Sequence, residues 1–181
     1  GMLYYSPQIW CSDDTDAIER LSIQEGTALL YPLSAIGAHV SDCPNHITGR
    51  TVPFQTRGHI ALAGTFGYEL DITKIPEADR AQIPEQVNLY HRYNELMREG
   101  DYDRIASWRE HHYYDCWQVT DKEKSVALLT YVQVLARANV KSRRIRFKNL
   151  IPEAQYVLEE TGKVYSGEML MQAGILIPPL K

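Results

Sequence analysis

The sequence predicts an α/β region with a parallel sheet, followed by a small antiparallel β domain. Through the first hundred residues, short apolar runs alternate with longer helix-like segments, at a spacing that is typical of βα units. After Asp101 this alternation ends, and short β-like runs separated by turn signals follow. We therefore expect two domains, residues 1–100 and residues 101–181.

The first predicted βα unit occupies the first thirty residues. Met2 to Trp10 is apolar and rich in aromatic residues, which favours a buried strand. Ala17 to Leu30 has the apolar spacing of an amphipathic helix, and Pro32 ends it. The helical period directs Ile18, Leu21, Ala28 and Leu29 toward a core and Glu19, Arg20 and Gln24 outward.

Two further units follow. Strands are predicted over residues 35–40 and 66–72, and helices over 54–63 and 84–99. Residues 41–53 form a loop with turn signals, Pro84 suits the first position of the long helix, and Gly100 ends that helix.

The second domain reads as an antiparallel arrangement of short strands. They are predicted over residues 113–119, 125–136, 142–150, 155–160 and 175–177, with a hairpin turn at Thr161-Gly162. The one basic cluster, Lys141 to Lys148, alternates with Ile145 and Phe147, which indicates the solvent face of a half-buried strand.

Composition excludes several classes of protein. A net charge of −4 does not suggest a nucleic-acid binder, because phosphate neutralisation needs concentrated Lys and Arg. No apolar run approaches the length of a membrane span, so no membrane partner is expected. Three unpaired-looking cysteines (Cys11, Cys43 and Cys116) argue against a disulfide framework and fit a reducing, cytoplasmic compartment.

Three carboxylates, Asp13, Asp14 and Asp16, crowd the turn between the first predicted strand and helix. Thr15 or Asp16 could cap the helix, and Glu19 could complete a capping box around Asp16. A cap needs only one carboxylate, however, and like charges this close raise one another's pKa, which keeps a carboxylic acid protonated near neutral pH. In α/β folds such a junction lies at the carboxyl end of a strand, where the active sites of these folds occur. This turn is therefore the candidate active site.

Other constellations carry weaker signals. His39-x3-Cys43-x2-His46 has metal-like spacing but lacks a fourth ligand, and lining a pocket at a strand end is an equal alternative. Glu69 and Asp71 are candidates for a second carboxylate, although salt bridging is the simpler role. Trp10 suits either a core position or stacking on a ligand. His111-His112 reads as an exposed pair before a strand.

Several of these segments together resemble the bacterial α-galactosidases of glycoside hydrolase family 36. The resemblance rests on residues 4–21 (YYSPQIWCSDDTDAIERL), 31–41 (YPLSAIGAHVS), 63–70 (AGTFGYEL) and 133–137 (QVLAR), and it extends over almost the whole chain. The family's nucleophile lies upstream in a Lys-Trp-Asp segment, and no tryptophan here is followed by Asp. The chain therefore resembles the C-terminal portion of such an enzyme.

The resemblance implies a fold, a mechanism and a site residue. The first domain would be the last three units of a TIM (β/α)8 barrel, and the second would be an incomplete β-sandwich domain. A whole barrel needs about 250 residues, more than the chain has. Asp13 matches the general acid/base of a retaining hydrolase that releases terminal α-linked galactose from melibiose- and raffinose-type oligosaccharides. No metal or organic cofactor is implied, and the substrate-binding residues are not identified.

A second hypothesis belongs to another class. Three βα units leave two sheet edges open, which invites pairing with another chain. The chain alone would then be a non-catalytic assembly module, with the missing upstream part of the barrel and further copies of itself as partners. Activity of the chain by itself would argue against that hypothesis.

Overall fold

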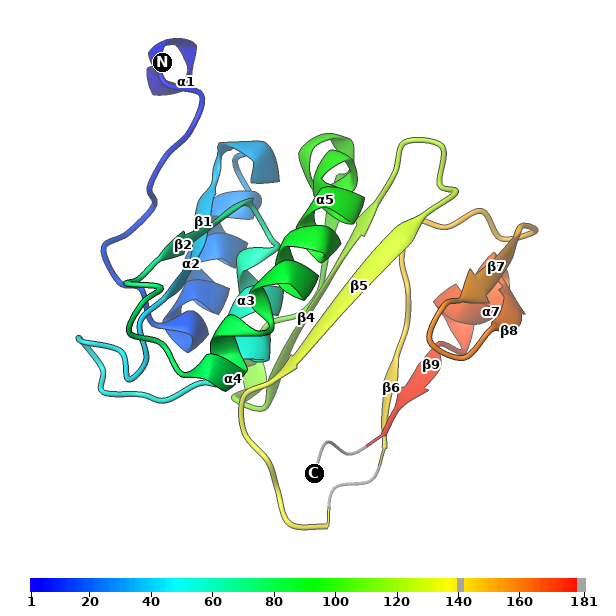
Figure 1. Cartoon of the computed structure of the whole chain (residues 1–181). Coiled ribbons are helices and arrows are strands. Elements are labelled where there is room, and N and C mark those ends of the chain that lie inside the picture. Colours follow the sequence, from blue (N-terminus) through cyan, green and yellow to red (C-terminus); the bar gives the residue numbers. More distant parts are fainter. Residues whose placement is uncertain (140–141, 179–181) are drawn as a thin grey trace. The chain divides into compact units, whose positions relative to one another are not determined.

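The computed structural model describes residues 1–139 and 142–178 and divides the chain into two compact units, Gly1–Glu99 and Gly100–Lys181 (Figure 1). The first unit is α/β. Its elements in chain order are α1 (Met2–Tyr5), α2 (Ala17–Ala28), the 3-10 helix η1 (Leu33–Ala35), β1 (Gly37–Ser41), α3 (Phe54–Ala61), β2 (Thr65–Glu69), α4 (Glu77–Arg80) and α5 (Ile83–Glu99).

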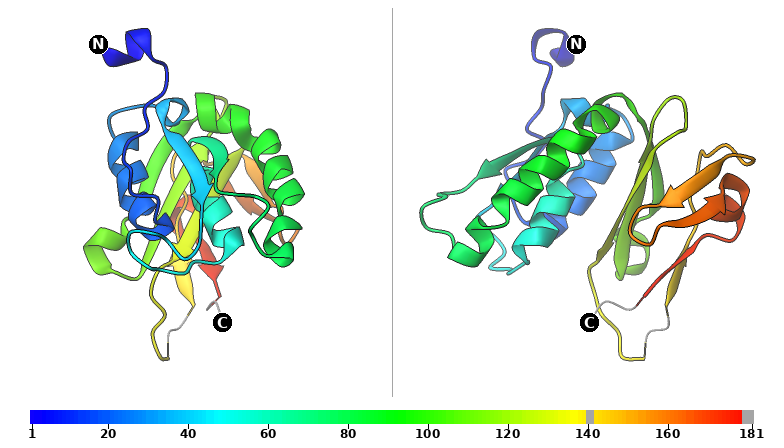
Figure 2. Two further views of the ribbon diagram at one scale, coloured as in Figure 1. Left: turned by 60° about the vertical axis from the view of Figure 1, so that its left-hand side comes forward. Right: turned by 45° about the vertical axis from the view of Figure 1, so that its right-hand side comes forward.

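The sheet of the first unit is parallel, as predicted. β1 pairs with β2 along its length, and on its other side Ile36 forms a single parallel bridge with Ile9. Every residue of β1 is buried, and α2 and α3 pack against it. Figure 2 shows α2, α3 and α5 gathered on the same side of the two strands. Because β1 is central, its carboxyl end is surrounded by the loops that precede α2 and α3.

The core explains why these segments fold together. Val40 of β1 and Phe54 and Ala61 of α3 form a buried cluster, against which Phe66 and Tyr68 of β2 pack. The apolar runs predicted as the second and third strands are therefore strands, within a few residues of the predicted bounds. The predicted helices 54–63 and 84–99 correspond to α3 and α5, and α5 begins one residue earlier than expected.

The prediction of a buried strand from Met2 to Trp10 is wrong. Met2–Tyr5 forms one helical turn whose side chains are mostly exposed, Tyr4 and Tyr5 at 87% each, and Trp10 is 47% exposed. A run of apolar residues becomes a strand only where hydrogen-bonding partners flank it. Among the described residues only Ile9 of this run has such a partner.

The helix predicted over Ala17–Leu30 forms as α2 and ends two residues early, at Ala28. Three side chains lie opposite to their predicted orientation, because Arg20 and Gln24 are buried and Leu29 is 56% exposed. Helical periodicity groups side chains on a face, but the partners that cover each face come from the rest of the fold. Here the polar face of α2 turns toward backbone carbonyls that Arg20 and Gln24 reach.

The second unit is mainly antiparallel, as predicted, and its strands form separate small sheets. Its elements in chain order are β3 (Asp101–Ala106), α6 (Trp108–His111), β4 (Tyr114–Thr120), β5 (Ala127–Gln133), β6 (Arg143–Ile145), β7 (Gln155–Leu158), β8 (Lys163–Ser166), α7 (Gly167–Gln172) and β9 (Ile175–Ile177). β4 lies between β3 and β5, β6 pairs with β9, and β7 pairs with β8 across the predicted hairpin turn. The sequence does not predict β3, α6, β8 or α7.

The basic strand of this unit shows the predicted alternation. Arg144, Arg146 and Lys148 are exposed, whereas Ile145 and Phe147 are buried at 2% and 8% exposure. Lys141 lies outside the described residues. The strand is shorter than the predicted 142–150, because its partner β9 offers only three residues for pairing.

Three further predictions concern the cysteines, the His111-His112 pair and membrane-spanning helices. All three cysteines are free thiols. His111 is not exposed as predicted, since its ring stacks on Tyr114 with centroids 4.3 Å apart, whereas His112 is exposed. Among the described residues, no helix combines the length and apolar composition that crossing a bilayer requires.

Candidate active site

The candidate turn begins directly after the Ile9 bridge and ends at the first residue of α2. Its three carboxylates have different surroundings. Asp14 accepts a hydrogen bond from the backbone N–H of Asp16 at 3.0 Å, and its own N–H donates to Ser12 Oγ at 3.1 Å. Asp13 is exposed, and its side chain has no hydrogen-bond or ion-pair partner in the part of the chain that the structure describes. Asp13 is therefore the carboxylate that is left available to a ligand.

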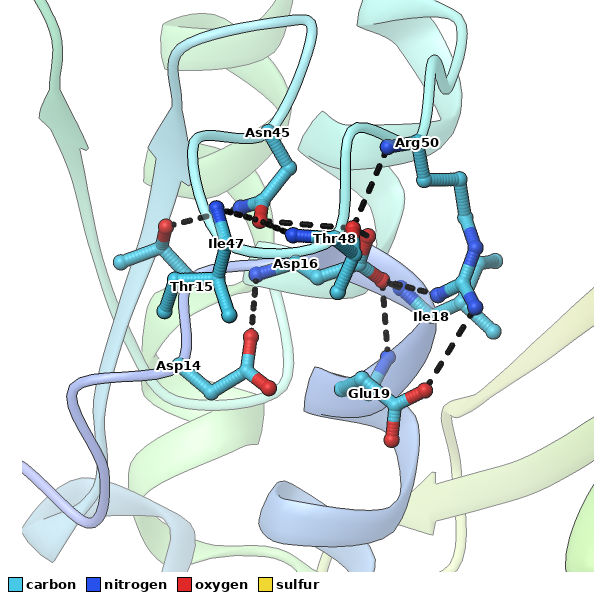
Figure 3. Close-up of polar contacts among 9 residues, drawn as sticks. All are labelled: Asp14, Thr15, Asp16, Ile18, Glu19, Asn45, Ile47, Thr48 and Arg50. Carbon is cyan, nitrogen blue, oxygen red and sulfur yellow. Dashed lines mark hydrogen bonds and ion pairs between the residues drawn. The ribbon is translucent and has the colours of Figure 1, made fainter.

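Asp16, not Thr15, caps α2, and the residue is 1% exposed. Oδ1 accepts from the backbone N–H groups of Ile18 and Glu19 at 2.8 and 3.1 Å (Figure 3). Only half of the expected capping box forms, because the N–H of Asp16 donates to Asp14 instead of to Glu19. One carboxylate of the three thus does the capping that the sequence predicts.

The loop that follows β1 binds the same carboxylate. Thr48 Oγ1 donates to Asp16 Oδ2 at 2.6 Å, and the Arg50 guanidinium pairs with Oδ1 (Figure 3). Burial alone would raise the pKa of Asp16, but the hydrogen bonds from Thr48, Glu19 and Ile18, together with the Arg50 charge, lower it below its ordinary value. Asp16 is consequently an anion with a structural role.

Asn45 joins the loop to the turn a second time. It is 6% exposed, and its Nδ2 donates to Thr15 Oγ1 at 3.0 Å. Its Oδ1 accepts the N–H groups of Ile47 and Thr48, both at 2.9 Å, which folds the loop into a compact turn (Figure 3). Turn signals in the sequence predict this loop, but no local pattern connects it with the carboxylates.

Arg20 reaches the turn from α2. Its guanidinium, in a residue 1% exposed, donates to the carbonyl of Ser12 at 3.3 Å and to that of Gly37 at 2.6 Å. Burial is the main cause that lowers the pKa of Arg20, and the charges of Cys11, Glu69 and Asp14 oppose it. Arg20 therefore connects the residue before Asp13 with the start of β1.

His39 of β1 contacts Trp10 through its ring. The two rings stack with centroids 4.3 Å apart and an interplanar angle of 7°. Burial and the neighbouring Arg20 lower the pKa of His39 to about 4, so the imidazole is neutral near pH 7. Trp10 is thus neither a core residue nor free on both faces, because one face of its indole contacts an imidazole.

The remaining candidates are the carboxylates Glu69 and Asp71 and the possible metal ligands His39, Cys43 and His46. Glu69 Oε2 lies 2.9 Å from His39 Nε2, and because this imidazole is neutral near pH 7 the contact is not a salt bridge. Hydrogen bonds from Thr73 and Lys74 lower the pKa of Asp71 to about 2. No cluster of three or more His, Cys, Asp or Glu side chains able to hold a metal ion is found among the described residues, which include His39, Cys43 and His46.

Two family models match most of the chain. Residues 1–100 match the Melibiase family, and residues 114–181 match the glycosyl hydrolase family 36 C-terminal domain. The bifunctional α-galactosidase/sucrose kinase AgaSK of Mediterraneibacter gnavus is 48% identical over 99% of this chain and 19% of its own length. The α-galactosidase AgaA of Geobacillus stearothermophilus is 46% identical over 98% of this chain and 24% of its own length.

Solved structures agree with these matches over the whole chain. The crystal structure of AgaA superimposes with a TM-score of 0.96 at 45% identity, covering 100% of this chain and 25% of that one. An AgaA variant crystallised in complex with raffinose also gives a TM-score of 0.96, at 44% identity and the same coverage. The chain thus spans about a fifth to a quarter of the relatives that it matches.

Proposed function

Because this chain belongs to the melibiase family, we propose that it is the acid/base-bearing part of a family 36 α-galactosidase. Asp13 carries the proposal. It is the exposed, unpartnered carboxylate of a turn whose other two carboxylates are engaged, and the turn follows a parallel strand segment. In this role Asp13 donates a proton to the glycosidic oxygen of the leaving group.

A retaining mechanism needs a second carboxyl group about 5–5.5 Å from the first, as nucleophile. Asp71 binds Thr73 and Lys74, and Glu69 Oε2 lies against His39 Nε2, so neither carboxylate is as free of protein contacts as that of Asp13. We therefore place the nucleophile on the upstream part that the relatives have. After it forms the galactosyl-enzyme, Asp13 takes a proton from the attacking water.

The fold and the partners of the whole enzyme belong to the same proposal. The first unit supplies the last three βα units of a TIM barrel, and the second supplies its C-terminal β-sandwich domain, with the boundary near residue 100. Substrates are terminal α-galactosides such as raffinose, with which the AgaA variant was crystallised. The enzyme acts as a homo-oligomer in the cytoplasm and uses no cofactor.

The test measures hydrolysis of p-nitrophenyl α-galactoside and raffinose by this chain, alone and mixed with the upstream part of AgaA. We expect activity only in the mixture. Asp13→Asn should lower kcat/KM on raffinose by about 10²- to 10⁴-fold, the usual contribution of a general acid. Asp14→Asn is the matched control, because it removes a charge one residue away and keeps the oxygen that accepts the N–H of Asp16.

Each outcome decides between named alternatives. Equal losses for Asp13→Asn and Asp14→Asn would reject Asp13 as the acid. Activity of the chain alone would mean that the nucleophile lies within it, and Glu69 would be tested next. No activity in either preparation would favour the assembly module, which is supported by one observation: among the described residues, β2 pairs only with β1, so its other edge is open.

A further inference from the structure

The backbone just before Asp13 is strained. Cys11 has a φ of 70°, a left-handed conformation that its Cβ disfavours. The N–H of Ser12 donates to the carbonyl of Trp10 at 3.0 Å, which closes a γ-turn with positive φ at its centre, a rare arrangement. Such a conformation persists only where the surrounding structure determines it.

Arg20 makes the contact that can hold this turn. Two of its guanidinium nitrogens donate to the carbonyls of Ser12 and Gly37, so the residue after the strained position is connected to the start of β1. Its Nε donates to Gln24 Oε1 at 3.4 Å, and Gln24 in turn donates to the carbonyl of Ile60 at 2.9 Å. The planar guanidinium is thereby oriented from a second direction, by α3.

Burial of the Arg20 guanidinium would be energetically unfavourable if the side chain only filled space in the core. Among the described residues, no carboxylate lies within ion-pair distance of Arg20, although the side chain is almost completely buried. A buried, unpaired charge is unfavourable, and an apolar side chain of similar size would pack at lower cost. What the guanidinium alone provides is a rigid fork of donors that reaches two carbonyls at once.

We propose that Arg20 is a positioning residue, which holds the strained turn at Cys11 and thereby fixes the direction of the Asp13 carboxyl. The kinetic part of this inference rests on the proposed role of Asp13 as the acid/base. Arg20 itself does not touch substrate in this proposal. It acts through the carbonyl of Ser12, the residue directly before Asp13.

Arg57 is a matched control. It is 7% exposed, and like Arg20 it donates to two backbone carbonyls, those of Val52 and Ser41. Unlike Arg20, it also pairs with a carboxylate, that of Asp79 at 3.4 Å, and its guanidinium lies over the ring of Phe54, but none of its contacts reaches residues 11–16. Arg20→Met and Arg57→Met thus remove a comparable buried guanidinium, and only the first removes a contact to the turn.

The kinetic test uses the chain mixed with the upstream part of AgaA and compares two leaving groups. Raffinose has a poor leaving group that needs a well-placed proton donor, whereas p-nitrophenol leaves with little help. We expect Arg20→Met to lower kcat/KM on raffinose at least about 10-fold more than on the aryl substrate. Arg57→Met should lower both equally, and Arg20→Lys should recover only part of the loss because an ammonium group lacks the fork.

A second test is independent of activity. In the chain alone, Cys11 should show the strong intraresidue amide-to-Hα nuclear Overhauser effect that a positive φ produces. We expect Arg20→Met to abolish it and Arg57→Met to retain it. If the unmodified mixture proves inactive, the proposed function fails and this measurement alone decides the role of Arg20. Persistence of the signal in Arg20→Met, or equal kinetic losses on both substrates, would overturn the proposal.

Discussion

Replacing Asp16 with alanine removes the acceptor on which the turn and the following loop converge. The backbone N–H groups of Ile18 and Glu19 lose their cap, and Thr48 and Arg50 lose their anionic partner. Loss of a cap costs about 1 kcal/mol, and loss of a hydrogen bond to a charged group costs about 1.5–3 kcal/mol. We expect Asp16→Ala to lower the free energy of unfolding by about 3–4 kcal/mol.

Asp16→Asn separates the two contributions. The amide oxygen still caps α2, but the charge that pairs with Arg50 is gone, so the expected loss is about 2 kcal/mol. The assay is urea denaturation followed by NMR signals of residues 1–99. Asp14→Asn is the control and should stay within about 0.5 kcal/mol of the unmodified chain. A loss below about 1 kcal/mol for Asp16→Ala, or equal losses for both Asp16 variants, would refute this reasoning.

The pH dependence of the same variants follows from the lowered pKa of Asp16. A carboxylate whose pKa is lower in the folded state stabilises the fold above its ordinary value of 3.8, and this contribution is lost as the pH falls below 3.8. The difference between the unmodified chain and Asp16→Asn should therefore be largest near about pH 6 and shrink toward about pH 3. A constant difference across that range would contradict the assignment of the charge.

Three further predictions concern other buried groups. The unfolded chain protonates His39 below its ordinary pKa of 6.5 and the folded chain only near 4, so stability should fall by up to about 3 kcal/mol between these values. An NMR titration of the imidazole and loss of that slope in His39→Gln check this. Gly174 has a φ of 69°, and a Cβ there would lie 2.1 Å from the carbonyl oxygen of Ile145. Gly174→Ala should therefore cost about 2–4 kcal/mol in thermal denaturation, more than either effect alone. Gln118 is 0% exposed and bonds both the N–H and the carbonyl of Lys148, so Gln118→Leu should cost about 2–4 kcal/mol and speed exchange of the Lys148 amide.

The contacts of the candidate turn differ in how far the sequence predicts them. The cap at Asp16 was predictable, because capping depends on residue type and on spacing within a few positions. The availability of Asp13 was not, since it depends on Asp14 and Asp16 being engaged by their own contacts. The loop residues Asn45, Thr48 and Arg50 lie about thirty positions away from these contacts. No local pattern marks a contact of that sequence separation.

The sequence by itself determined the order and type of most elements, the parallel sheet of the first unit and the alternation of Ile145 and Phe147. These follow from periods of two and 3.6 residues, which are local properties of the chain. Only the tertiary structure decided that Met2 to Trp10 is largely unpaired and that Arg20 is buried. The physical reason is the same in both cases. A strand needs a neighbouring backbone, and a buried guanidinium needs acceptors, and both are supplied by residues distant in the sequence.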